Sequence, residues 1–249
     1  MDRRVIYCHG LPGSPEELSA FGAWTPRQHV HGLDRLGHHN GPYEENVLLA
    51  FDAIGVDEPV TLVGFSLGAM SAVRIAAERG PLVRKLILIS PAAPLQLGNF
   101  LPVMAGRPVF EAAQAGDLAL RLFTASQASL VALAPKLAVK TMFRASTDAE
   151  LDLLASPRFV EVVVRGLRTC LGPRQAAYRG ELHAYVRPWA HVLDDIRCET
   201  EIWSGSLDDW APPAMSEALK ERLGDRASLN VCPGLGHYST LRTALSRLD

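Results

Sequence analysis

The chain of 249 residues has little cysteine and little net charge, and each scarcity excludes a class of protein. Its four cysteines are too few for a disulfide scaffold, and no two have the C-x-x-C spacing of a zinc or redox site. The 25 basic and 27 acidic residues nearly cancel, so the sequence lacks the electrostatic signature of a nucleic-acid or anionic-membrane partner. We therefore expect a small-molecule partner, no nucleic-acid partner, and reduced core thiols. These thiols are Cys8, Cys170, Cys198 and Cys232.

Long apolar runs are also missing. No stretch of about 18 consecutive apolar residues occurs, which predicts that the chain does not span a membrane. The first residues, Met-Asp-Arg-Arg before Val5, lack the apolar stretch and cleavage site of a signal peptide. The sequence thus predicts a cytoplasmic protein, and it leaves both a monomer and a homodimer open.

The apolar fraction of 48% excludes disorder and is enough for one substantial core. Short apolar runs bounded by turn residues predict strands that are buried on both faces, as in a parallel sheet. These runs comprise residues 4–8, 60–65, 85–89, 200–203 and 227–232. Helical patterns at 43–54, 67–79 and 213–223 lie between them. This alternation predicts an α/β fold with a doubly wound, mostly parallel sheet.

Residues 94–188 interrupt the alternation, because they show helical patterns and no convincing strand. Thr147 and Glu150 form a capping-box pattern, and Ser156-Pro157 begins a helix with apolar residues at helical spacing. That spacing outweighs the strand propensity of the run Val162-Val163-Val164. We predict a core domain of residues 1–93 and 189–249 that carries a helical cap insertion of residues 94–188.

Charge is divided unevenly between these two parts. Residues 92–190 hold 11 Lys and Arg against 7 Asp and Glu, whereas the rest of the chain is acidic. The basic balance of the cap faintly favours a substrate that carries a carboxylate, and surface solvation explains the same charge equally well.

The sharpest local feature is a G-x-S-x-G string, Gly64-Phe65-Ser66-Leu67-Gly68. Such a string arises by chance in roughly one chain in ten of this length, so it is weak alone. Its context strengthens it, because it follows a strand pattern and opens a helix pattern, which is the setting of a nucleophile elbow. Gly64 and Gly68 permit the tight turn, and the helix behind Ser66 directs its positive end toward a developing anion. We predict Ser66 as a nucleophile.

A serine hydroxyl needs a base that is itself held in place. Asp208 follows the strand pattern 200–203, and His237 follows the last strand pattern behind two glycines. The order Ser66, Asp208, His237 is the one expected of α/β-hydrolases, and all three residues follow strand C-termini, where open α/β sheets place their sites.

With these motifs the chain resembles the α/β-hydrolase superfamily, specifically its cap-bearing serine esterase-like members, over nearly its whole length. The resemblance also rests on His9-Gly10-Leu11-Pro12-Gly13, on 33–38, on Gly205-x-x-Asp208-x-x-x-Pro212 and on Pro233-Gly-x-Gly-His237. It implies an oxyanion hole built from the backbone N–H groups of Leu11 and Leu67, and a supporting loop with His9 and Gly10. The family commonly has more strands before the His-Gly turn, so we expect a sheet shortened at its N-terminal edge, with a weak strand near 29–34.

Two local alternatives compete with these roles. Asp209 rivals Asp208 as the acid, but the spacing to Gly205 and Pro212 favours Asp208 and leaves Asp209 exposed or capping the next helix. A metal site is the second alternative. Its ligands would be His29, His31, His38 and His39, but no carboxylate or thiolate joins them at ligand spacing. We expect neither a metal nor an organic cofactor.

The sequence therefore predicts a hydrolase that cleaves a small acyl substrate, most simply a carboxylic ester, through an acyl-enzyme. Thioester, lactone, amide and carbon–carbon cleavage are related possibilities. The same scaffold could also serve as a small-molecule receptor, or as a cofactor-free lyase or oxygenase in which His237 acts as a base.

Overall fold

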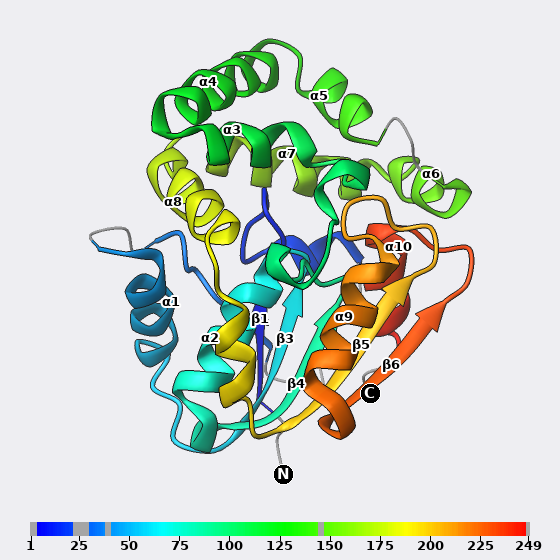
Figure 1. Cartoon of the computed structure of the whole chain (residues 1–249). Helices are drawn as coiled ribbons and strands as arrows, with labels where there is room; N and C mark the ends of the chain where they lie inside the picture. The colour runs from blue at the N-terminus through cyan, green and yellow to red at the C-terminus, as the bar shows by residue number, and fades with distance from the viewer. Residues whose placement is uncertain (1–3, 22–29, 38–40, 144–146, 248–249) are drawn as a thin grey trace.

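A computed structural model of the chain describes residues 4–21, 30–37, 41–143 and 147–247 (Figure 1). Six parallel strands form one sheet in the order β2-β1-β3-β4-β5-β6. The strands are β1 (Val5–Cys8), β2 (Val30–Gly32), β3 (Val60–Phe65), β4 (Val83–Ile89), β5 (Glu199–Gly205) and β6 (Ala227–Cys232). The predicted parallel α/β sheet is confirmed, and it ends at the three-residue strand β2, whose side chains are only partly buried.

Four helices cover the two faces of the sheet. Figure 1 shows α1 (Tyr43–Asp52), α2 (Gly68–Glu78) and α9 (Pro213–Leu223) on the near face and α10 (His237–Leu245) on the far face. Helices lie on either side of the two central strands, which explains why residues 62–65 of β3 and 86–89 of β4 are all buried.

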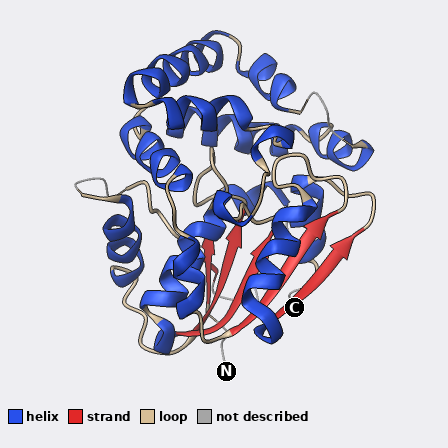
Figure 2. Ribbon diagram, in the orientation of Figure 1, coloured by secondary structure: helices blue, strands red, loops and turns tan. Residues whose placement is uncertain are grey.

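Every described element between β4 and β5 is helical, as Figure 2 shows. The six α-helices are α3 (Arg107–Ala115), α4 (Asp117–Leu133), α5 (Pro135–Met142), α6 (Asp148–Leu154), α7 (Pro157–Leu171) and α8 (Gln175–Val186). We call them the cap; they lie beyond the C-terminal ends of the strands (Figure 1). The run Val162-Val163-Val164 lies inside α7, so the helical prediction there is confirmed. The division into two domains stays a prediction.

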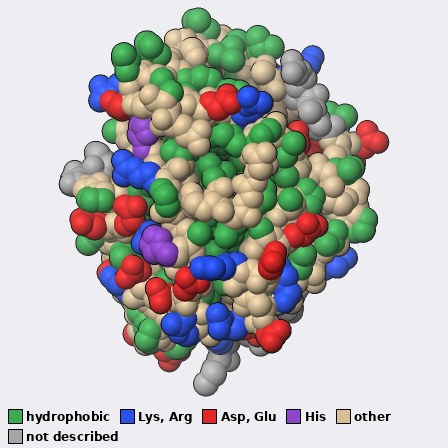
Figure 3. All heavy atoms as spheres, in the orientation of Figure 1, with side chains coloured by type: hydrophobic (Ala, Val, Ile, Leu, Met, Phe, Trp, Pro, Cys, Tyr) green, Lys and Arg blue, Asp and Glu red, His purple; other side chains and the backbone are tan. Residues whose placement is uncertain are grey.

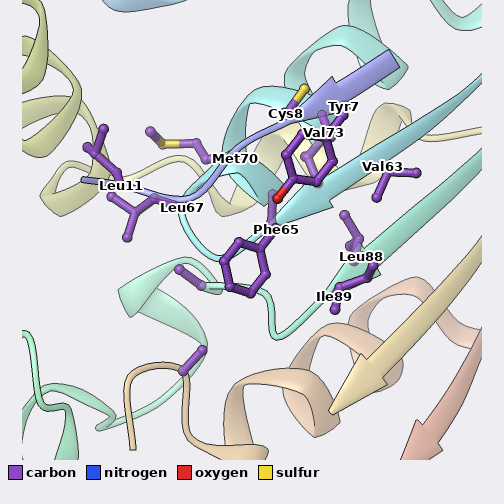
Figure 4. Packing of buried hydrophobic residues seen from close by; sticks show 14 of the residues in the cluster. Tyr7, Cys8, Leu11, Val63, Phe65, Leu67, Met70, Val73, Leu88 and Ile89 are labelled. Carbon is purple, nitrogen blue, oxygen red and sulfur yellow. The ribbon is translucent and has the colours of Figure 1, made fainter. Parts of the chain in front are cut away.

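Side chains from the sheet and from the helices form one continuous core. Figure 4 shows part of it, with Tyr7 of β1 and Phe65 of β3 packed among aliphatic residues. Three of the four free cysteines are buried in this core. Cys198 is partly exposed because it directly precedes the N-terminal end of β5. The expectation of four core thiols is therefore corrected to three.

The surface is mixed in character. On the face shown in Figure 3, acidic, basic and apolar side chains alternate over short distances. None of the described helices combines the length and the apolar character needed to cross a membrane.

Candidate active site

The turn between β3 and α2 presents Ser66 in a strained backbone conformation. Its φ angle is +56°, in the left-handed region that residues other than glycine rarely adopt. A side chain at Gly68 would overlap the carbonyl oxygen of Cys8, and a Cβ at Gly64 would lie 2.8 Å from that of Ala72. The two glycines therefore allow α2 to pack closely behind the serine, as the sequence pattern predicts.

The predicted acid and histidine meet at the neighbouring strand ends. Nδ1 of His237 lies 2.8 Å from Oδ2 and 3.1 Å from Oδ1 of Asp208. The Asp208 carboxylate also accepts hydrogen bonds from the backbone N–H groups of Trp210 and Ala211, both at 2.9 Å, which fix its orientation. His237 is the first residue of α10, and its ring packs on that of Phe65 at 4.7 Å between centroids.

Asp209 does not take the position that the sequence suggested for it. It is only partly exposed, and α9 begins after Pro212 without a side-chain cap. The prediction that Asp209 is exposed or caps α9 is therefore wrong. The Asp208 carboxylate is held by the N–H of Ala211 and by His237, whereas Asp209 lines the cavity described below.

Opposing effects act on the pKa of His237. Burial of the ring lowers the pKa, whereas the adjacent Asp208 carboxylate and the charges of Glu150 and Glu17 raise it. The net result is a raised pKa. An imidazole that is held on a carboxylate and has a raised pKa is suited to accept a proton from a hydroxyl group.

The loop after β1 lies beside the serine. His9 is fully buried, and its Nδ1 lies 2.7 Å from the carbonyl oxygen of Gly10. Burial, and then the charge of Arg35, hold the pKa of His9 well below its usual range. Figure 4 shows Leu11 and Leu67 next to each other. Within the described residues, neither of their backbone N–H groups donates to an acceptor.

A cavity of about 400 Å³ lies over these groups, between the core and the cap. Ser66, Leu11 and Leu67 form its floor, and the cap helices α3, α4, α5, α7 and α8 form most of its walls. The walls are mainly apolar. Their polar side chains are Gln127, Thr141, Tyr178, Asp209 and Trp210, and the described lining includes no Lys or Arg. Among the described residues, the basic side chains of the cap therefore do not line the cavity over Ser66.

The proposed histidine metal site finds no support in the described residues. Among them, no three His, Cys, Asp or Glu side chains are grouped closely enough to hold an ion. His31 lies exposed on β2, and His29, His38 and His39 lie outside the described residues.

Glu150 is a residue near His237 whose position the sequence did not reveal. Its backbone N–H donates to Thr147 at 3.3 Å, which is half of the predicted capping box. Its carboxylate instead reaches from α6 to α10, where Oε1 accepts from the backbone N–H of Ser239 at 2.7 Å and from its hydroxyl at 2.8 Å. The T-x-x-E pattern located a helix start, but it could not show that the carboxylate has a distant partner.

The profile of the alpha/beta hydrolase family matches residues 5–245. The chain belongs to this family. No curated protein sequence matches it significantly.

Several solved alpha/beta hydrolases share the fold at low sequence identity. A thermophilic esterase from Thermogutta terrifontis, solved with malate bound, has 17% identity and a TM-score of 0.66 over 99% of this chain and 89% of its own. The enol-lactonase from Burkholderia xenovorans LB400 has 15% identity and a TM-score of 0.67 over 99% and 88%. Est816, an N-acyl homoserine lactone degrading enzyme, has 18% identity and a TM-score of 0.58 over 99% and 91%. At these identities the likeness concerns the fold alone.

Proposed function

We propose that this alpha/beta hydrolase is a serine hydrolase that cleaves a small carboxylic ester through an acyl-enzyme. The observation that carries the proposal is the hydrogen-bonded pair of His237 and Asp208. The His237 ring packs on Phe65, which directly precedes the strained Ser66 at the floor of the cavity. The esterase and the lactonase with the same fold agree with ester chemistry.

The reaction divides into two steps. In the first, His237 takes the proton of Ser66 while the serine oxygen attacks the acyl carbon, and Asp208 stabilises the imidazolium that forms. The backbone N–H groups of Leu11 and Leu67 donate to the oxyanion of the tetrahedral intermediate. His237 then protonates the departing alcohol, and water repeats the attack on the acyl-enzyme. The chemistry needs neither a metal nor an organic cofactor.

The size of the cavity limits the substrate. A volume of about 400 Å³ accepts a small acyl compound, and the apolar walls favour a short or medium hydrocarbon chain. The cap helices supply most of these walls, so the cap selects the acyl group while the core carries the reacting side chains.

The nucleophile can be tested directly by covalent labelling. Wild-type protein treated with a fluorophosphonate is expected to gain one adduct on Ser66, detected by peptide mass spectrometry, and to hydrolyse p-nitrophenyl esters of short acyl chains. Ser66→Ala should lose the adduct and reduce kcat by roughly 10³-fold or more. Ser71→Ala is the control, because Ser71 is a buried serine of α2 bonded to Tyr43 and should leave both readouts intact.

Two results would contradict the proposal. Full turnover in Ser66→Ala would show that no acyl-enzyme forms on this serine, as in a lyase or oxygenase that uses His237 alone as base. Tight binding of small acyl compounds with neither adduct nor turnover would favour a receptor.

A further inference from the structure

Asp209 is a carboxyl group of the cavity that the triad does not use. It follows Asp208 directly, but the described residues provide no ion pair for it, and its carboxyl is approached by its own backbone N–H. Its position is nevertheless fixed, because its carbonyl oxygen accepts from the N–H of Ala105 at 2.7 Å and the next N–H, that of Trp210, is held by Asp208. The backbone of Asp209 is thus anchored at the cavity wall, while its carboxyl group has no side-chain partner among the described residues.

Gln127 adds a second acceptor to the same cavity. It lies on α4, and its Oε1 is buried without a hydrogen-bond partner in the described part of the chain. A buried amide oxygen without a donor costs free energy, which a ligand that donates a hydrogen bond there would recover.

The two acceptors stand among apolar neighbours such as Phe123, Val109 and Leu167. Burial, and then the charge of Asp208, raise the pKa of Asp209, while His237 and the backbone N–H of Asp209 lower it; the net result is a raised pKa. The carboxylate is thus compensated only in part. A positively charged or hydroxyl-bearing group would supply that compensation, whereas a second carboxylate would add repulsion.

We propose that Asp209 and Gln127 form a subsite that selects acyl substrates with a hydrogen-bond-donating group, an ammonium or a hydroxyl, and rejects those with a carboxylate. The inference rests on the proposed ester hydrolysis and names its substrate class. It opposes the preference that the basic charge of the cap alone would suggest.

The test compares four p-nitrophenyl esters of equal chain length at pH 8: the hexanoate, the 6-hydroxyhexanoate, the 6-aminohexanoate and the mono-ester of adipate. Wild-type kcat/KM is expected to be higher for the hydroxy and amino esters than for the adipate ester. Asp209→Asn should reduce the amino-to-hexanoate ratio, and raise the adipate-to-hexanoate ratio, by about tenfold each. Gln127→Leu should reduce the hydroxy-to-hexanoate ratio.

Asp152→Asn is the matched control, since Asp152 is an exposed acid of α6 and its loss changes the net charge equally. The ratios should stay at their wild-type values in this variant. Calorimetric titration of Ser66→Ala protein with hexylamine and with hexanoate gives a readout that requires no turnover, and hexylamine should bind more tightly.

The outcomes separate the subsite from the reaction. Two results would overturn the subsite alone, provided that the hexanoate is hydrolysed in a serine-dependent way. One is that the kcat/KM ratios are unchanged in Asp209→Asn and Gln127→Leu, and the other is that the wild-type protein prefers the adipate ester. Absent turnover and labelling would overturn ester hydrolysis, and tighter binding of hexanoate than of hexylamine would then overturn the subsite as well. If Asp209→Asn does not fold, the wild-type preference and Gln127→Leu decide.

Discussion

Two buried glutamates lie near His237 and differ in how their charge is compensated. Glu17 accepts hydrogen bonds from Tyr7 at 2.7 Å and from the N–H of Gly10 at 2.9 Å. Oε1 of Glu150 accepts two hydrogen bonds from Ser239, while its Oε2 has no hydrogen-bond partner among the described residues. Burial raises the pKa of both carboxyl groups, and each in turn raises the pKa of His237.

These charges predict the pH dependence of the reaction. His237 must be neutral to act as a base, and its pKa is raised, so kcat/KM should fall on acidification through a pKa above 6.5. Glu150→Gln keeps an oxygen for Ser239 but removes the charge that favours the imidazolium. The acidic limb of the kcat/KM profile is therefore expected to move to lower pH in this variant.

Asp148→Asn provides the comparison, because Asp148 lies exposed on the same helix and its loss should leave the limb in place. If the acidic limb of the kcat/KM profile is unchanged in Glu150→Gln, or moves to higher pH, the charge of Glu150 does not raise the pKa of His237.

At the scale of single elements, α7 approaches the loop after β1 through a glycine. Gly166 is buried, and a Cβ there would lie 2.9 Å from Cα of Gly13. On the same helix, the Cys170 thiol donates to the carbonyl oxygen of Gly13 at 3.3 Å. This contact places the cap directly against the residues that follow Leu11.

The contact predicts opposite effects for two identical substitutions. Gly166→Ala should lower the free energy of unfolding by about 1–3 kcal/mol, because the methyl group overlaps backbone that cannot rotate away. Gly180→Ala, on the exposed face of α8 with nothing within 4 Å, should raise it by up to about 1 kcal/mol through helix propensity. Urea denaturation of both variants checks the pair, and equal effects would refute the steric argument.

Patterns of single elements were largely predictable. The bounds of β3, β6 and α9 agree with those read from the sequence, because apolar periodicity and terminating glycines act locally. Strand β2 has the weakest sequence pattern, since Val30–Gly32 lie at the sheet edge, where His31 is exposed and its two neighbours are partly buried.

At the scale of the whole molecule, a buried ion pair joins the cap to the core. Nε of Arg35, in the loop after β2, donates to both carboxylate oxygens of Glu181 on α8, at 3.0 and 2.9 Å, and Nη2 donates to Oε1 at 2.8 Å. Both side chains are almost completely excluded from solvent. Removing these two charges from water costs free energy, and each charge is compensated only by the other.

Removing one charge of the pair should therefore lower the free energy of unfolding more than removing both. Glu181→Leu leaves the Arg35 guanidinium buried without a counter-charge and is expected to lower the free energy of unfolding by about 3–5 kcal/mol. Arg35→Met combined with Glu181→Leu should regain most of that loss. Chemical denaturation of the single and double variants measures the difference, and additive losses would mean that the two charges are not coupled.

The sequence by itself determined the parallel α/β architecture, the helical nature of the cap, and the candidates Ser66, Asp208 and His237. It could do so because strand and helix periods are local, and because parallel topology gathers the C-terminal strand ends at one edge. Only the tertiary structure decided where Asp209, Glu150 and Gln127 point, and how large the cavity is. These features depend on how helices far apart in the sequence pack on one another, and no local period encodes that packing.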